Sequence, residues 1–208
     1  MRLYHGSKAG IEGPIRPISR DRCDFGAGFY MGTDKLQQLT LVCEYETPYL
    51  YTLDFDMDGL SILELPSDLD WALYIAYNRG KLDAGQSPAL FEHVSSLAAG
   101  CDVISGKIAN DRMFVVLDQF FNGTITDSAL IACLEALDIG TQYVAKTQRA
   151  CNHVHIVEAH ELDADERAAY TTQSRENRKV GIARADAICR EHRRDGRFFD
   201  EILQEWTV

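Results

Sequence analysis

Two short segments near the start of the chain carry the residues best suited to chemistry. The first reads Leu3-Tyr4-His5-Gly6-Ser7, and the second reads Asp24-Phe25-Gly26-Ala27-Gly28-Phe29-Tyr30. The His5 imidazole can hydrogen-bond a sugar hydroxyl, Gly6 offers a backbone amide without a side chain, and Tyr30 offers an aromatic face to a flat ring. The glycines before Tyr30 let the backbone turn sharply and approach a ligand. Together the two segments predict a nucleotide pocket.

A later segment could complete such a pocket. The run Asn110-Asp111-Arg112 holds a guanidinium suited to bidentate phosphate binding and a carboxylate suited to proton abstraction or to stabilising a cation. A helix cap with a surface ion pair is the alternative interpretation of this run.

Strand and helix patterns along the chain must position these residues. We expect strands at 2–5, 49–55, 60–65, 101–106, 141–145 and 153–159. We expect helices at 34–43 with Asp34 as cap, 67–79, 89–98, 111–121, from Thr126 or Asp127 to Gly140, and two after residue 163 that separate near Gly196. Residues 1–160 are therefore predicted to form one α+β domain, and 161–208 a helical C-terminal extension.

Composition limits the classes of function. The 208 residues are 46% apolar and 10% aromatic, which favours a folded core over disorder. A formal net charge of −11 disfavours a long basic groove for duplex nucleic acid. We expect no membrane segment, because no apolar run reaches the roughly 18 residues that span a bilayer.

The six cysteines are scattered without paired spacing, and the start of the chain lacks the apolar core of a signal peptide. We therefore expect reduced thiols and a cytoplasmic protein. Cys151, His153 and His155 would share one face of the last strand and could mimic a metal site. Their spacing fits no common zinc pattern and no fourth ligand is evident, so we expect no metal and assign them to strand surface and core.

The first two segments resemble two of the three motifs of the PARP-type, or His-Tyr-Glu type, ADP-ribosyltransferases. His5 stands at a strand end and Tyr30 follows a Phe-Gly-x-Gly turn, while Gln142 stands where that family has its Glu. The resemblance implies an ADP-ribosyltransferase-like split antiparallel β-sandwich that uses NAD as co-substrate. It implies that His5 binds the adenosine-side ribose, that the Gly6 backbone pairs with the carboxamide, and that Tyr30 stacks on nicotinamide.

We assign the predicted site residues to a catalytic set and a cofactor-binding set. The catalytic set consists of His5, Tyr30, Gln142 and Asp111. The cofactor-binding set consists of His5, Gly6, Ser7, Gly28, Tyr30, Asn110 and Arg112.

Nearly the whole chain also resembles a bacterial family known as domain of unknown function 3990, which is grouped with the ADP-ribosyltransferases. The likeness rests on Leu-Tyr-His-Gly-Ser, Asp-Phe-Gly-x-Gly-Phe-Tyr-x-x-Thr-Asp, Asp-Val-Ile-x-Gly-x-Ile-Ala-Asn-Asp-Arg, Thr-Gln-Tyr-Val and Gly-Arg-Phe-Phe-Asp-Glu-Ile-Leu. This resemblance implies a toxin-like enzyme with a macromolecular acceptor, chiefly protein, and a small antitoxin-like or regulatory partner protein.

The leading hypothesis is accordingly an NAD-dependent mono-ADP-ribosyltransferase. Because Gln142 carries no charge, the departure from Glu disfavours polymer formation and fast NAD hydrolysis, and leaves transfer of a single ADP-ribose. Two alternatives stay open. One is an NAD-binding module that has lost turnover, and the other is an RNA-directed ADP-ribosyltransferase, for which a small basic funnel would suffice.

Overall fold

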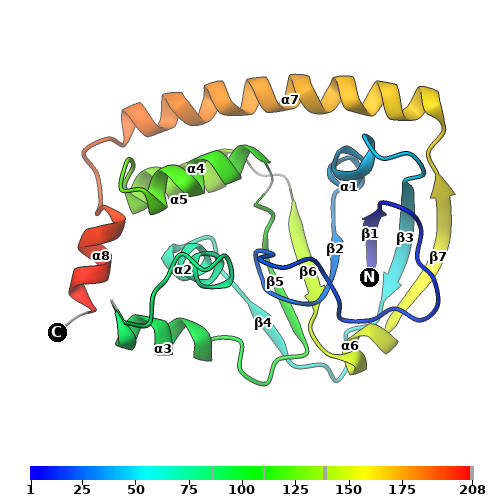
Figure 1. Ribbon diagram of the computed structural model, residues 1–208, viewed down its shortest axis with the longest axis horizontal. Helices are drawn as coiled ribbons and strands as arrows, with labels where there is room; N and C mark the ends of the chain where they lie inside the picture. The colour runs from blue at the N-terminus through cyan, green and yellow to red at the C-terminus, as the bar shows by residue number, and fades with distance from the viewer. Residues whose placement is uncertain (86, 110, 138–139, 207–208) are drawn as a thin grey trace.

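One seven-stranded sheet runs through the part of the chain that the computed structural model describes, which is residues 1–85, 87–109, 111–137 and 140–206 (Figure 1). The strand order is β4-β5-β6-β2-β1-β3-β7. All paired neighbours are antiparallel except β4 and β5, which are parallel. The strands are β1 (Arg2–Ser7), β2 (Phe29–Gly32), β3 (Tyr49–Phe55), β4 (Ile62–Glu64), β5 (Val103–Lys107), β6 (Thr141–Ala145) and β7 (Val154–Glu161).

The pairing between β1 and β2 is the weakest link in this sheet. These two strands share a single register pair, Tyr4 with Gly32. By contrast, β1 pairs with β3 over six residues, from Arg2 to Ser7, and β2 pairs with β6 over all four of its own. The sheet therefore divides into a four-strand half (β4, β5, β6, β2) and a three-strand half (β1, β3, β7) that meet at this break.

The α+β class expected from the sequence is confirmed, and the arrangement of strands differs from the expectation in one respect. We expected two separate antiparallel sheets, and the structure joins the strands into one hydrogen-bonded sheet with one parallel pair. The physical reason is the Tyr4–Gly32 pair, which connects the two halves although the strands part beyond it.

Eight helices accompany the sheet within the described residues. They are α1 (Lys35–Val42), α2 (Leu69–Asn78), α3 (Pro88–Ser96), α4 (Asp111–Phe121), α5 (Asp127–Ala136), α6 (Gln148–Asn152), α7 (Ala164–Glu191) and α8 (Phe199–Glu205). The expected caps are present: the Asp34 carboxylate accepts from Leu36 and Gln37, and the Thr126 hydroxyl accepts from Ala129.

The short elements β2 and α6 were not predicted. Cys151 lies in α6, His153 caps that helix and only His155 lies on β7, so the expectation that all three share a strand face is wrong. The cause is local, since the Thr147 hydroxyl accepts from the Ala150 amide and starts a helical turn just before the strand.

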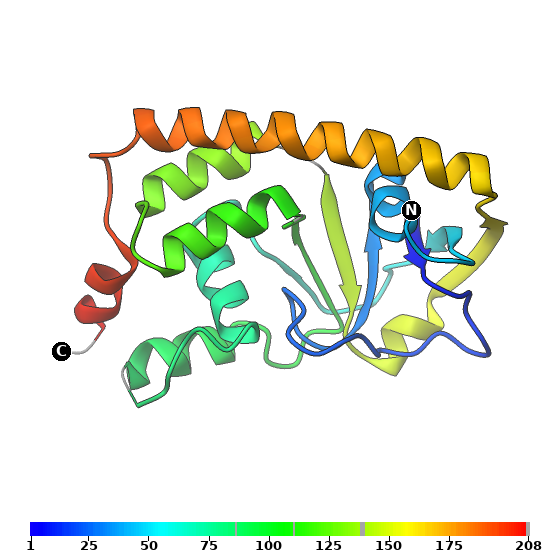
Figure 2. The ribbon, with the colours of Figure 1, turned by 45° about the horizontal axis from the view of Figure 1, so that its top comes forward.

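Three apolar clusters pack against the sheet in the described part of the chain, and the long helix α7 extends past both of its halves (Figure 2). The larger core packs α2, α3, α4, α5 and α8 around the fully buried Trp71 and Phe120. Near its start, α7 places Tyr170 against Leu39 of α1 and Leu50 of β3, and further along it buries Ala185 in the larger core. Helix α7 thus contacts both sides of the break.

In the described part of the chain, no helix combines the length and apolar character needed to cross a membrane. The six cysteines carry free thiols.

We predict that the C-terminal helix α8 contributes directly to stability. Phe199 is 5% exposed and packs edge-on against Phe120 and Phe121, whereas the preceding Phe198 is 37% exposed. Phe199→Ala should lower the free energy of unfolding by about 3–5 kcal/mol, because it opens a cavity in the core. The matched variant Phe198→Ala should cost about 0.5 kcal/mol. Equal losses in a urea titration of both variants would contradict this packing.

Candidate functional site

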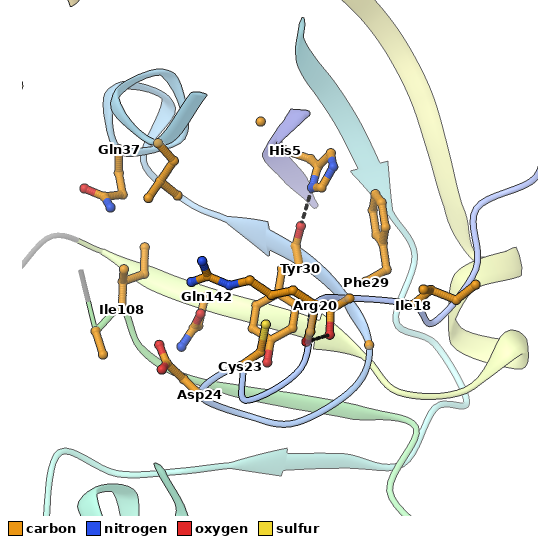
Figure 3. Close-up of a pocket in the computed structure, with 15 residues that line it drawn as sticks. His5, Ile18, Arg20, Cys23, Asp24, Phe29, Tyr30, Gln37, Ile108 and Gln142 are labelled. Atoms are coloured by element: carbon orange, nitrogen blue, oxygen red, sulfur yellow. Dashed lines mark hydrogen bonds between the residues drawn. The ribbon is translucent and has the colours of Figure 1, made fainter. Parts of the chain in front are cut away.

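A cavity of about 290 Å³ lies at the break between β1 and β2 (Figure 3). Its walls come from both halves of the sheet, from helix α1, and from the long loop that connects β1 to β2. The lining includes His5, Tyr30 and Gln142, and the structure thus brings together the three sequence motifs that were predicted to share a site. Ile18 and Leu41, which are 68% and 49% exposed, also line it and leave it an apolar rim.

The His5 ring takes the place of backbone pairing at the break. Its Nδ1 lies 2.7 Å from the carbonyl oxygen of Tyr30, which would face β1 if the ladder continued. Because a carbonyl oxygen only accepts, Nδ1 carries the proton and Nε2 is left as an acceptor. Burial lowers the pKa of His5, against the opposing effect of that hydrogen bond, so the ring is held neutral. No residue of the described chain is bonded to Nε2, which makes it a hydroxyl acceptor for a ligand.

Tyr30 contributes its ring, because its hydroxyl is already committed. The hydroxyl accepts from the Phe25 amide at 3.0 Å and donates to the Gly26 carbonyl at 2.8 Å. Burial raises the pKa of Tyr30, so the phenol stays protonated. Its ring is therefore the part that can contact a ligand, while its hydroxyl fixes the loop just before β2.

Gln142 lies on β6 opposite glycines on both neighbouring strands. Its register partners are Gly32 on β2 and Gly106 on β5. The Gln38 side chain and the Phe25 ring take the space that Cβ atoms at these two glycines would need. The Gln142 side chain is 7% exposed, and its Nε2 donates to the Lys107 carbonyl at 3.5 Å. The amide oxygen has no partner in the region that the structure describes. Gln142 therefore presents a second neutral acceptor.

Three further residues of the predicted cofactor set have different positions. Gly6 lines the cavity, and its amide donates to the Gln38 side chain at 3.4 Å. A Cβ at Gly6 would lie 2.6 Å from the Gln38 carbonyl oxygen of α1, so only glycine lets this helix approach β1 so closely. Gly28 also lines the cavity, whereas Ser7 does not and instead donates to the Gly10 carbonyl.

The predicted Asn110-Asp111-Arg112 contribution cannot be placed. Asn110 lies outside the described residues, and so do the side chains of Asp111 and Arg112, whose backbone begins α4. Ile108 and Ala109, just before them, line the cavity.

Two charged residues that sequence reasoning missed also line the cavity, Arg20 and Asp24. Asp24 pairs with Arg79, the residue that caps the C-terminal end of α2, with Nε of Arg79 donating at 2.9 Å. Burial raises the pKa of the Asp24 carboxyl, and the guanidinium of Arg79 opposes this shift. Asp24 begins the second motif, so its position was a signal, but its partner lies 55 residues away in sequence.

The arrangement suits a ligand that combines hydroxyl groups, a flat ring and an anionic group. His5 Nε2 and the Gln142 amide oxygen accept hydrogen bonds, the Tyr30 ring offers a stacking surface, and Arg20 adds positive charge. A metal ion is not needed for such binding. In the described part of the chain, no three His, Cys, Asp or Glu side chains are grouped to hold one.

Comparison with known proteins identifies a family. The family model described as "Protein of unknown function (DUF3990)" matches residues 1–156, which contain all seven strands in part or in full. Neither the curated proteins nor the solved structures contain a match to this chain.

We predict that the His5 ring is neutral and protonated on Nδ1 at pH 7. The ¹⁵N chemical shifts of the ring should show this tautomer, and protonation should begin only below the ordinary histidine pKa of about 6.5. Since the unfolded chain then binds the proton before the folded protein does, His5 should make stability fall as the pH drops below about 6.5. A doubly protonated ring in the folded protein at pH 6.5 would contradict this account.

Proposed function

The chain belongs to the DUF3990 family, and we propose that it is an NAD-dependent ADP-ribosyltransferase with a PARP-like site. One observation carries the proposal. His5, Tyr30 and Gln142 come from distant parts of the sequence and line one cavity, in the order of the His-Tyr-Glu motifs. The break in the sheet resembles the split sheet of that fold, although one backbone pair closes it here.

The chemical groups of NAD match the groups that line the cavity. His5 Nε2 would accept from a hydroxyl of the adenosine-side ribose, and the amide oxygen of Gln142 from a hydroxyl of the nicotinamide-side ribose. The Tyr30 ring would stack on nicotinamide. The Gly6 amide makes only a 3.4 Å contact with Gln38, so it is available to pair with the nicotinamide carboxamide.

We assign diphosphate binding to Arg20. Among the described residues that line the cavity, it is the only one with a permanent positive charge, and no hydrogen bond is recorded for its guanidinium. A guanidinium matches two phosphate oxygens at once and keeps its charge at every physiological pH. Arg20 would thus provide the phosphate-binding guanidinium that the sequence analysis assigned to Arg112.

The proposed acceptor is a macromolecule, with protein favoured over RNA. The net charge of −11 disfavours close approach of a polyanion, and the exposed Ile18 and Leu41 at the rim suit an apolar contact. A small regulatory protein that covers this rim belongs to the same proposal.

Incubation with labelled NAD and cell lysate, followed by separate recovery of protein and RNA, should show label in protein. Label confined to RNA would contradict this choice of acceptor.

We predict that His5→Ala weakens NAD binding by about tenfold, because it removes one hydrogen bond in a site shielded from water. Tyr30→Ala should weaken binding more strongly, since it removes the stacking surface and releases the loop at Phe25 and Gly26. Titration calorimetry with NAD measures both effects.

The matched control is His155→Ala, which changes an exposed histidine on β7 away from the cavity and should bind NAD as the wild type does. Equal affinity in all variants would refute the assigned site. NAD binding by the wild type without release of nicotinamide would leave a binding module and reject the transferase.

A further inference from the structure

We propose that Asp24 supplies the carboxylate that the third motif lacks, and that it faces the reacting ribose in the cavity at the sheet break. This inference rests on the proposed function. In the PARP-type pattern the charge comes from the last strand of the motif set, where this chain has Gln142. Here the negative charge would come from Asp24 on the loop before β2, which lines the same cavity as Gln142.

The ion pair with Arg79 leaves half of the Asp24 carboxylate unused. Both Nε and Nη2 of Arg79 donate to the same oxygen, Oδ1. The usual paired arrangement of guanidinium and carboxylate engages both oxygens. No bond to Oδ2 is recorded in the described part of the chain, and Asp24 lines the cavity together with Gln142 and Tyr30. Figure 3 draws both side chains among those that line the cavity.

The hydrogen-bonding groups of Arg79 are also incompletely paired, which is unusual for a purely structural ion pair. Its Nη1 is buried and has no hydrogen-bond partner among the described residues, and the guanidinium lies over the Phe114 ring with 4.5 Å to the centroid. The Arg79 and Asp24 side chains are 9% and 17% exposed, so both charges are largely removed from water. Burial of two charges is costly unless their hydrogen bonds are complete, and this pair is therefore better explained by function than by stability.

The loop holds Asp24 in a fixed place. The next residue, Phe25, is fully buried, and a Cβ at Gly106 would lie 2.8 Å from its ring, so that glycine makes room for it. The Phe25 amide donates to the Tyr30 hydroxyl, and the Lys146 ammonium donates to the Phe25 carbonyl. Asp24 is thus anchored through Arg79 on one side and Phe25 on the other, which is the preorganisation that electrostatic catalysis requires.

The proposed reaction needs only NAD, the residues of the cavity and one nucleophile, which is an acceptor hydroxyl or water. The bond between C1′ of the ribose and the nicotinamide nitrogen breaks, and its electron pair returns to the nicotinamide ring. A lone pair on an acceptor hydroxyl, or on water, forms the new bond to C1′. Asp24 stabilises the positive charge that develops on the ribose and accepts the hydroxyl proton, which it passes to solvent. Gln142 holds the ribose hydroxyl.

The ionised form of Asp24 is required, so the activity should depend on pH. The groups around Asp24 are Arg79, which caps the C-terminal end of α2, Arg20 and Cys23 from its own loop, and Tyr30 from β2. Burial raises the pKa of the Asp24 carboxyl despite the arginines. Activity should therefore fall on the acid side at a pH above that of an ordinary aspartate. Arg79→Gln removes a cation that favours the ionised form and should move that loss to still higher pH.

The test measures release of nicotinamide from NAD by the full-length protein, with water as acceptor, and NAD affinity by calorimetry. Asp24→Asn keeps the oxygen that accepts from Arg79 and removes the charge. We expect it to bind NAD within about threefold of the wild type and to release nicotinamide at least about 100-fold more slowly. Adding Gln142→Glu to Asp24→Asn should restore release by about tenfold or more, because it returns a carboxylate to the cavity.

Asp127→Asn is the matched control. Asp127 is another buried aspartate paired with an arginine, Arg197 at 3.3 Å, and it lies at the start of α5 outside the cavity. It should lower the Tm and leave the turnover per folded molecule unchanged. If Asp24→Asn behaves like this control while the wild type releases nicotinamide, the inference is wrong and the proposed function stands. If the wild type binds NAD but releases no nicotinamide either with water or with the proteins of a cell lysate as acceptor, both are wrong.

Discussion

The single backbone pair between β1 and β2 is the constraint on which the rest of the site depends. If the ladder continued past Tyr4 and Gly32, backbone groups would fill the space that the cavity now occupies. The His5 ring satisfies the carbonyl of Tyr30 and so removes the cost of an unpaired acceptor. The same hydrogen bond fixes the tautomer of His5. One contact therefore both stabilises the open sheet and leaves Nε2 as an acceptor.

The elements around the break keep it open and stable. Helix α1 lies against β1 because Gly6 has no side chain, and α7 packs on α1 at one end and on α4 and α5 further along. The loop before β2 is fixed by the Tyr30 hydroxyl and by the Arg79 side chain. Rigid walls on both sides would let the cavity bind a ligand without first paying a large entropy of ordering.

Local signals predicted most of the elements, and long-range contacts decided the rest. The side-chain caps at Asp34 and Thr126 and the aromatic run Tyr49–Phe55 are properties of neighbouring residues, so the sequence was sufficient to find them. The four residues of β2 are too few to give a period, and they form a strand because β6 pairs with them.

The site shows the same division between local and long-range signals. The motifs indicated that His5, Tyr30 and Gln142 belong together, but no sequence pattern predicted that Arg79 would pair with Asp24. The Asp24–Arg79 ion pair at the cavity could therefore be identified only from the folded structure.

The central claim is that the break in the sheet is an NAD site. A crystal structure of the protein soaked with NAD tests it most directly. We predict density for the dinucleotide in the cavity, with a ribose hydroxyl on His5 Nε2, nicotinamide on the Tyr30 ring, and the Asp24 carboxylate facing the nicotinamide-side ribose. NAD bound elsewhere on the protein, with this cavity unchanged, would contradict the account.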